Sequence, residues 1–226
     1  TGRDHALREA DHQIFIKQLR TICSPGVDGI TADQHLKYGI PTSLPLHLSV
    51  MLTLCLRFCC LPDEFFTGMV TPILKKPHLD PSKPQHYRPI TVSVSISKIL
   101  EMYMLEERRS FVPHPCQFGF ESHRGTNTVI SLASDVVSYC AARGYSVYLC
   151  SLDAEGAFDC LPHQKLFEKA LDILPPHAWR ILYHWNSRMT AAIKWGGRVS
   201  CSMPVQRGTR QGGLSSTLLF NIFIRG

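Results

Sequence analysis

Apolar residues recur at helical spacing along much of this chain. The pattern predicts helices over residues 3–22, 44–60, 94–112, 126–143, 161–171 and 178–189. The segment 44–60 is the densest in apolar residues, which is typical of a buried helix. In the helix over 161–171, Pro162 would stand in the first turn, where its missing N–H group costs nothing.

Shorter β-rich runs alternate with these helices. We expect strands over residues 68–77 and 145–153, and a hairpin over 191–205 whose turn is Gly196-Gly197. Residues 78–89 form a proline-rich loop of the kind that lies exposed, and residues 207–224 read as a glycine loop that leads into an apolar helix. Strands and helices are mixed without a strict βαβ rhythm, so the predicted fold class is α+β.

Composition excludes some classes of protein. At 226 residues and 44% hydrophobic, the chain can bury a substantial core, as one large domain or two subdomains. It contains no run of about 18 apolar residues, so we expect no membrane span. The charged N-terminal segment does not resemble a signal peptide. Nine cysteines occur without paired CxxC motifs, which favours reduced thiols of an intracellular protein over a zinc site or disulfides.

The net charge of +6 is unevenly distributed. Residues 71–100 contain five basic residues and one acid, Asp80, and the 54 residues after Asp172 contain seven basic residues and no acid. Such one-signed surface suggests a polyanionic partner. A merely basic surface of a water-soluble protein fits the charge equally well.

The segment SVYLCSLDAEGAFDCL, residues 146–161, offers candidate chemistry. Asp153 would stand at the end of a strand, on the same face as Glu155 if the strand continues, and a carboxylate there suits Mg²⁺. Gly156 and Ala157 would let a phosphate group approach their N–H groups, and Phe158 would form a flat wall beside it. Asp153 also fits a plain turn or helix cap. Asp159 is expected to be structural.

Basic residues and a glycine loop elsewhere fit the same chemistry. Lys75 and Arg88 lie in ILKKP and YRPITV, where lysine offers a point charge and arginine a bidentate phosphate contact. Gln211 is flanked by glycine at a helix start, and helix N-termini bind anions. The sequence has no GxxxxGK[ST], HExxH or GxSxG motif, which argues against an ordinary P-loop nucleotidase.

Four segments in a fixed order carry a family resemblance. They are TPILKKP with YRPITVSVSISKILE, then QFGFESHRGTNTVI, SLDAEGAFDCLPHQKLF and GTRQGGLSSTLLFNIF. Together they resemble the motifs of reverse transcriptases, most closely those of non-LTR (LINE-type) retrotransposons, from about residue 24 to the last residue. The resemblance implies a right-hand polymerase fold. Residues 1–125 would form the fingers, 126–165 the start of the palm with the first catalytic aspartate, 166–212 a return to the fingers, and 213–226 palm again.

The resemblance also implies roles for individual residues. Asp153 would be a catalytic residue and, with the Ala154 carbonyl, a metal ligand. Gly156 and Ala157 would donate to the incoming triphosphate, and Phe158 would exclude a 2′-hydroxyl group. The further nucleotide-binding residues would be Lys75, Arg88, Gln211 and Gly212. The implied cofactor is Mg²⁺, at a two-metal site. The implied partners are an RNA template, a DNA primer or target and dNTPs, and no membrane is expected. The expected location is inside the cell, in nucleus and cytoplasm.

Some positions depart from the family pattern. Glu121 stands where many relatives carry a basic residue, for which Arg124 would compensate unless template contact is weakened there. Thr217 stands where proline is common. Neither change removes a catalytic group.

A larger departure concerns the second catalytic motif, a hairpin with paired aspartates that follows the RQGG helix in the family. Residues 173–226 contain no carboxylate side chain, and two-metal catalysis needs several, so we expect this chain to be a fragment that is inactive alone. Three interpretations stay open: a module of an RNA-directed DNA polymerase, a catalytically incompetent remnant that at most binds nucleic acid, and an unrelated Mg²⁺ phosphotransferase.

Overall fold

The computed structural model describes residues 9–18, 25–107, 112, 114–121, 124–154 and 156–225. Its helices are α1 (Glu9–Gln18), α2 (Leu44–Phe58), α3 (Asp63–Phe66), α4 (Ser95–Glu107), α5 (Thr126–Ala141), α6 (His163–Ala170), α7 (Pro176–Ser187) and α8 (Ser215–Ile224), with short turns of helix at η1 (Ala32–Lys37) and η2 (Pro84–His86). Its strands are β1 (Thr67–Leu74), β2 (Tyr87–Val92), β3 (Thr190–Trp195), β4 (Arg198–Val199) and β5 (Met203–Pro204). The fold is α+β, as predicted.

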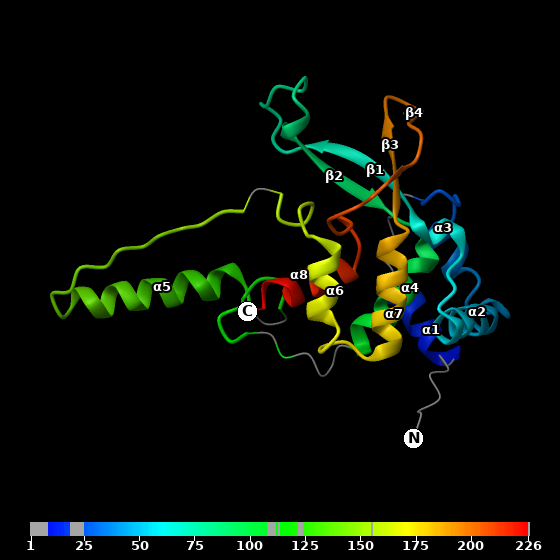
Figure 1. The fold of residues 1–226 in the computed structure, drawn as a ribbon, viewed down its shortest axis with the longest axis horizontal. Helices are drawn as coiled ribbons and strands as arrows, with labels where there is room; N and C mark the ends of the chain where they lie inside the picture. The colour runs from blue at the N-terminus through cyan, green and yellow to red at the C-terminus, as the bar shows by residue number, and fades with distance from the viewer. Residues whose placement is uncertain are drawn as a thin grey trace.

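A five-stranded mixed sheet stands on the helices (Figure 1). β1 pairs with β2 in antiparallel and with β3 in parallel orientation, while β3 also pairs with β4 and β5. Gly196 and Gly197, at φ +53° and +78°, join β3 to β4, which confirms the predicted hairpin and its turn. The parallel pairing joins two parts of the chain that lie more than a hundred residues apart in sequence.

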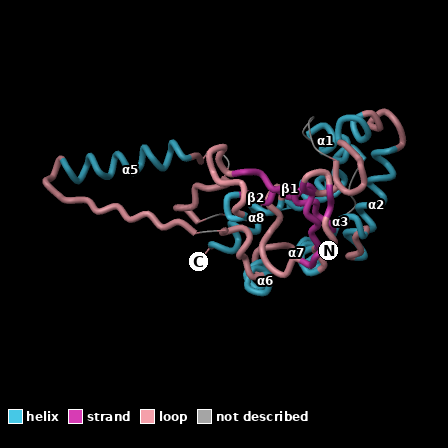
Figure 2. Tube along the Cα trace, turned by 90° about the horizontal axis from the view of Figure 1, so that it is seen from above, coloured by secondary structure: helices cyan, strands magenta, loops and turns pink. Residues whose placement is uncertain are grey.

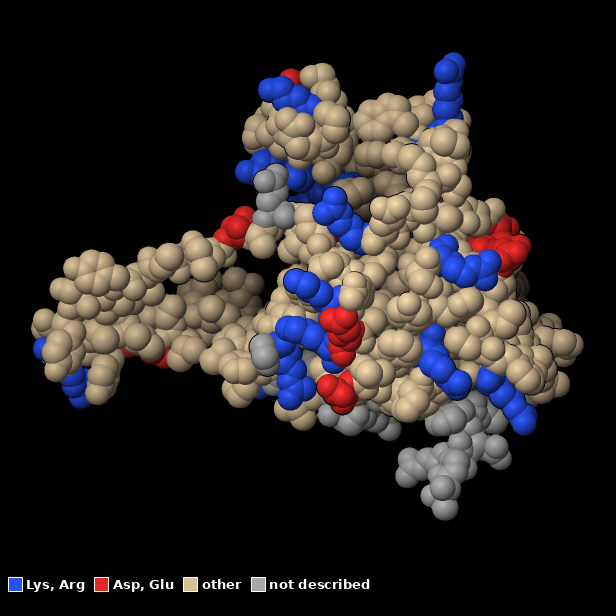
Figure 3. Space-filling model, viewed as in Figure 1, with Lys and Arg blue, Asp and Glu red and all other residues tan. Residues whose placement is uncertain are grey.

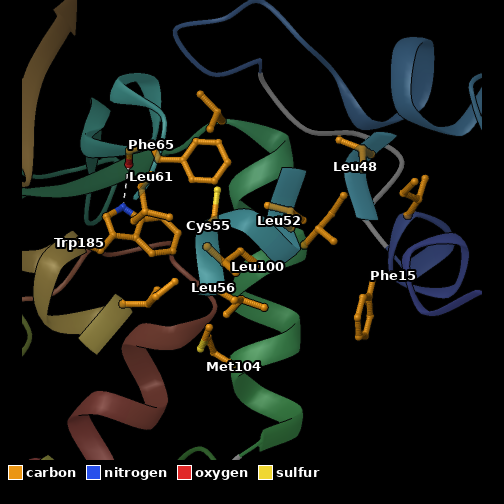
Figure 4. Close-up of a cluster of buried hydrophobic side chains, with 14 of the residues drawn as sticks. Phe15, Leu48, Leu52, Cys55, Leu56, Leu61, Phe65, Leu100, Met104 and Trp185 are labelled. Atoms are coloured by element: carbon orange, nitrogen blue, oxygen red, sulfur yellow. Dashed lines mark hydrogen bonds between the residues drawn. The ribbon is translucent and has the colours of Figure 1, made fainter. Parts of the chain in front are cut away.

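Two apolar clusters hold the helices together. The larger one lies among α1, α2, α4 and α7, where Leu52, Leu100 and Ile181 are fully buried. Figure 4 shows its centre, where the indole N–H of Trp185 donates to the Phe65 carbonyl oxygen at 2.7 Å. The smaller cluster joins α6, α7 and α8 through residues such as Phe167 and Leu219. These clusters fix α4 and α8 beneath the sheet.

Most predicted elements are confirmed within the described residues. α2, α5, α6, α7 and α8 match predicted helices. The helix predicted over 3–22 is described as Glu9–Gln18 and the one predicted over 94–112 as Ser95–Glu107, and residues 3–8, 19–22 and 108–111 lie outside the described part of the chain. β1 matches the strand predicted over 68–77. β2 was not predicted, because Pro89 and the preceding proline-rich loop hide a strand that pairs with β1 on one edge only.

The strand predicted over residues 145–153 is wrong. Residues 145–154 run as extended chain without strand pairing to any described residue, and together with α5 they project from the body (Figures 1 and 2). Tyr148 and Leu152 are each 94% exposed, and no described side chain of α5 is fully buried. Without a neighbouring strand to supply hydrogen bonds, β propensity alone does not make a strand.

No helix among the described residues is long and apolar enough to cross a membrane. The described cysteines are all free, and burial raises the pKa of the Cys55 thiol to about 11.

Candidate functional site

The glycine loop between β5 and α8 lies against the edge of the sheet. The Thr91 N–H donates to the Gln211 carbonyl oxygen at 2.7 Å, and so adds the loop to β2. Gly212 follows at φ +117°, where a Cβ atom would lie 2.7 Å from the Thr91 carbonyl oxygen. Only glycine fits this close approach without moving the loop. The sequence motif RQGG therefore forms a tight turn between the edge of the sheet and the start of α8, and we call this turn the corner.

Arg210 anchors this corner from inside the protein. Its Nη2 donates to the Phe65 carbonyl oxygen, and the guanidinium carbon lies 5.0 Å from the centroid of a Trp185 ring. Arg210 is only 8% exposed, and this burial lowers the pKa of the guanidinium to about 10, although the nearby Glu101 carboxylate opposes the shift. A buried arginine of this kind positions the loop instead of meeting solvent.

Glu101 of α4 holds the other end of the loop, where α8 begins. Its Oε2 accepts the Ser215 N–H at 2.8 Å, so a carboxylate caps the first turn of α8. Burial raises the pKa of Glu101, and the Arg210 charge opposes that rise. Neither Glu101 nor the buried position of Arg210 was predicted. The sequence does contain a signal for Glu101. It stands four residues after Ser97, on the face of the helix that the apolar pattern predicts to be buried, and an acid on such a face needs a partner.

Asp159 links the loop to the segment that follows Asp153. The Gln211 side-chain amide donates to both Asp159 carboxylate oxygens, at 2.8 Å each. The Phe158 carbonyl oxygen accepts the Thr209 N–H at 2.8 Å. The expectation that Asp159 is structural agrees with this contact, although its partner is 52 residues away in sequence rather than in the next helix.

The two linked segments line a cavity of about 300 Å³ that is open to solvent. The predicted residues Gly156, Ala157 and Phe158 line one side, and the predicted residues Gln211 and Gly212 line the other. The remaining lining residues are Phe120, Arg210, Gly213, Ser216 and Thr217. Five of the nine predicted site residues thus meet around one space.

Three aromatic rings pack beside this cavity. Phe158 stacks on Phe220 of α8 with ring centroids 4.7 Å apart, and Phe120 contacts both edge-on at 5.5 and 6.1 Å. Phe120 has φ +61°, which is rare for a residue with a side chain. Sequence reasoning did not single out Phe120 or Phe220.

Asn221 of α8 holds the segment that carries Phe120. Its Nδ2 donates to Glu121 Oε1 at 2.7 Å, and its Oδ1 accepts from Gln117 Nε2 at 3.2 Å. The Arg124 guanidinium donates to the Pro115 and Gln117 carbonyl oxygens. Glu121 and Arg124 thus both make hydrogen bonds within the protein.

Lys75 and Arg88 lie outside the cavity lining but on one face of the β1–β2 hairpin. The Lys75 N–H donates to the His86 carbonyl oxygen at 2.8 Å, which continues the antiparallel register by one pair. Side chains alternate along a strand, so Lys75, Arg88 and Ile90 share a face. A Cβ atom on Gly212 would lie 3.8 Å from Ile90 Cγ2, so this face is the one beside the cavity. Both basic side chains are exposed.

Asp153 and Ala154 lie on the projecting segment and do not line the cavity. The carboxylate of Asp153 is exposed and is the kind of oxygen ligand that Mg²⁺ takes. The described residues contain no group of three side chains able to hold a metal ion. In kind Asp153 fits a magnesium ligand, but the described side chains supply only part of a site.

Comparison with known proteins identifies the family. The family model described as reverse transcriptase (RNA-dependent DNA polymerase) matches residues 73–226, which is more than half of the chain. The chain belongs to the reverse transcriptase family. The match includes every residue that lines the cavity, from Phe120 to Thr217.

Relatives of this reverse transcriptase chain come from non-LTR retrotransposons. A putative 115 kDa protein of the element R1DM of Drosophila melanogaster is 27% identical over 223 residues, which is 97% of this chain and 21% of the relative. The RNA-directed DNA polymerase of the mobile element jockey of Drosophila funebris is 27% identical over 92% of this chain and 23% of the relative. The Pol polyprotein of element R2 of Popillia japonica is 27% identical over 88% of this chain and 27% of the relative. The chain spans about a quarter of the length of these relatives or less.

Proposed function

We propose that this chain forms the fingers and part of the palm of an RNA-directed DNA polymerase, which extends a DNA primer on an RNA template. The observation that carries the proposal is the 300 Å³ cavity between residues 156–158 and the Gln211-Gly212 corner. Two family motifs, more than 50 residues apart, contribute backbone and small side chains to one space open to solvent. A nucleotide of the size of a dNTP suits such a space.

Each cavity wall has a role in this proposal. The N–H groups of Gly156 and Ala157 would donate to phosphate oxygens, and Phe158 would lie against the sugar. Gln211 and Gly212 would support the base and the template strand. Lys75 and Arg88, on the hairpin face beside the cavity, would neutralise the triphosphate, with Arg88 able to bind two oxygens at once.

Asp153 and the Ala154 carbonyl would be ligands for Mg²⁺, which activates the primer hydroxyl group and stabilises the leaving pyrophosphate when bound. Asp153 alone is one carboxylate, and further oxygen ligands would be needed. We therefore propose that this chain binds nucleotide and nucleic acid but does not extend a primer by itself.

The projecting part fits the palm of such a fold. The 16-residue helix α5 would be only marginally stable alone in water, and its side chains Ile130, Leu132 and Val136 are each about half exposed. In a longer protein like the relatives, further palm elements would cover α5 and give residues 145–154 a strand partner. The proposed division remains fingers over 1–125 and 166–212, and palm over 126–165 and 213–226.

The test measures binding of a fluorescent dATP analogue to the 226-residue chain in Mg²⁺ by anisotropy. We expect saturable binding that Arg88→Ala weakens by about tenfold, since a charge-assisted contact contributes about 1.5 kcal/mol. The matched control is Arg57→Ala, an exposed arginine of α2 outside the cavity.

A second arm offers a primed RNA template with dNTPs and Mg²⁺. We expect no extension above that of Asp153→Ala. Absence of dATP binding in a folded chain would reject the cavity assignment, and extension that Asp153→Ala abolishes would reject the proposal that the chain is inactive alone.

A further inference from the structure

A second hollow lies in a groove between α6 and α7. Its volume is about 450 Å³, and its lining is drawn from residues 163–171 and 179–187. Trp179 and Tyr183 line it from α7, where a spacing of four residues places them on one face of the helix. Phe167 and Glu168 line it from α6. We call this hollow the α6–α7 pocket, and it shares no lining residue with the cavity proposed for the nucleotide.

Three aromatic rings line the α6–α7 pocket and hold one another in place. The Trp179 and Tyr183 rings are stacked, with centroids 5.0 Å apart and planes at 5°. The Phe167 ring is perpendicular to both, at 6.2 Å from Trp179 and 5.4 Å from Tyr183. The Trp179 indole N–H donates to the Phe167 carbonyl oxygen at 2.8 Å, which fixes the orientation of the indole ring. A pocket formed before binding loses little conformational entropy when it is filled.

The charge of the pocket is opposite to that of the chain. Glu168 lines it together with no described lysine or arginine, although the net charge of the chain is +6. Glu168 Oε1 accepts from Gln164 Nε2 at 2.9 Å, whereas the neighbouring Lys169 donates to the carbonyl oxygens of Phe223 and Arg225. Figure 3 shows acidic atoms over α6 and a mostly uncharged surface between α6 and α7. The pocket therefore favours a cation and disfavours a polyanion.

The described part of the chain places no cation of its own over these rings. Six described lysine and arginine side chains lie over an aromatic ring, and none of those rings belongs to Phe167, Trp179 or Tyr183. Tyr183 is 46% exposed, and Leu171, which lines the pocket just after α6, is 60% exposed. Aromatic faces attract cations, most strongly where water is excluded. A ligand from outside can therefore reach aromatic surface that no described basic residue occupies.

We propose that the α6–α7 pocket binds the methylated side chain of a lysine in a protein partner. The methylated ammonium group would lie against the aromatic rings, and Glu168 would supply the opposite charge. The four-carbon stem of the lysine would lie along Leu171 and cover apolar surface there. This binding needs neither nucleotide nor nucleic acid.

Methylation suits the ligand to this pocket because it keeps the charge and removes hydrogen-bond donors. An unmodified lysine ammonium group has three N–H donors, and Glu168 Oε1 already accepts from Gln164. A trimethylated ammonium group has no donor that must find an acceptor. It can therefore meet aromatic surface without leaving a polar group unpaired.

The experiment measures the anisotropy of a fluorescent peptide, Gly-Ser-Lys-Ser-Gly, with the full chain. The lysine is trimethylated, unmodified, or replaced by the uncharged tert-butyl isostere of trimethyllysine. We expect the trimethylated peptide to bind about tenfold more tightly than the isostere, since a partly desolvated cation over aromatic rings contributes about that factor. It should also bind more tightly than the unmodified peptide.

Variants test which side chains recognise the charge. Tyr183→Leu should remove most of the preference for the trimethylated peptide over the isostere, whereas Tyr183→Phe should keep it. Glu168→Gln should reduce the preference about threefold, as expected for one exposed carboxylate. The matched controls are Tyr38→Leu, at a tyrosine that is 80% exposed elsewhere, and Glu64→Gln, at an exposed glutamate of α3. Both should bind like the wild type.

Equal affinity for the trimethylated peptide and its isostere would overturn the proposal, as would an unchanged preference in a folded Tyr183→Leu variant. Tighter binding of the unmodified peptide would also overturn it. Displacement of the peptide by an equimolar amount of choline would overturn the choice of a lysine side chain, because the ligand would then be a free quaternary ammonium compound. Absence of dATP binding in the earlier test would leave these outcomes unaffected, so the two proposals fail separately.

Discussion

The side-chain amide of Gln211 donates to both carboxylate oxygens of Asp159, at 2.8 Å each. This contact joins the segment after Asp153 to the glycine loop across 52 residues of sequence. Both residues stand on the rim of the same hollow beside β1. The two motifs that border the proposed nucleotide cavity are therefore joined to one another directly, and not only through the sheet.

Replacing Asp159 should loosen the glycine loop. In Asp159→Ala we expect faster amide hydrogen exchange at residues 209–213, because Gln211 loses both acceptors. A double-mutant cycle with Gln211→Ala should give a coupling energy of about 1 kcal/mol between the two side chains. This is less than a buried hydrogen bond to a charged group contributes, because the pair is exposed. Asp135→Ala, an exposed aspartate of α5, is the control. Unchanged exchange at 209–213 would show that the sheet contact through Thr91 suffices.

Glu101 should make stability fall as pH rises. Burial raises its folded-state pKa above the unfolded value, so its contribution is fully present below the unfolded pKa and is lost as pH rises through the folded pKa. Glu101→Gln keeps an acceptor for the Ser215 N–H and cannot ionise. We therefore expect the wild type to lose free energy of unfolding relative to Glu101→Gln as pH rises from about 4 through the folded-state pKa of Glu101.

Urea denaturation at a series of pH values measures this difference. Glu64→Gln, at an exposed glutamate of α3, is the matched control and should follow the wild-type profile. A Glu101→Gln profile parallel to the wild type would mean that Glu101 has the same pKa in both states.

Sequence patterns located most elements because those elements are local. Gly196-Gly197 fixed the hairpin turn by its positive φ angles, and the apolar spacing of 44–60 was enough to define α2. The residues that sequence reasoning missed depend on distant partners. Glu101 meets the N-terminus of α8 114 residues later, and β2 is a strand because β1 lies beside it. For residues 145–153 the β propensity was present, but no described segment pairs with them as a neighbouring strand, so the prediction failed.

Asn221 should control the order of the segment that carries Phe120. It is 2% exposed and joins Glu121 and Gln117 to α8, so Asn221→Ala leaves buried polar groups without their partner. We expect a loss of about 2 kcal/mol in the free energy of unfolding and faster hydrogen exchange over residues 114–121. Asn186→Ala, at a buried asparagine that donates within its own helix, should lower stability without changing exchange there. Exchange over 114–121 that responds equally to both variants would contradict this role for Asn221.

Phe158 should decide between deoxyribose and ribose. Its ring lines the proposed nucleotide cavity and stacks on Phe220 at 4.7 Å, so it is held by a neighbour while it faces the space where a sugar would lie. A ring packed against C2′ leaves no room for a hydroxyl group, which rejects ribonucleotides by steric clash. In a polymerase-active protein that contains this chain, Phe158→Val should retain dNTP incorporation and raise the rNTP to dNTP efficiency ratio. The same packing predicts a cost of about 1–2 kcal/mol in stability, below that of a fully buried phenylalanine.

Phe220→Leu separates these two effects. Phe220 does not line the cavity, so losing its ring should lower the melting temperature by removing the stack while Phe158 still blocks a 2′-hydroxyl group. Single-nucleotide incorporation with dNTP and rNTP, alongside thermal melts, compares the variants. If Phe158→Val and Phe220→Leu lose stability alike and neither changes the efficiency ratio, Phe158 is a packing residue and sugar selection lies elsewhere.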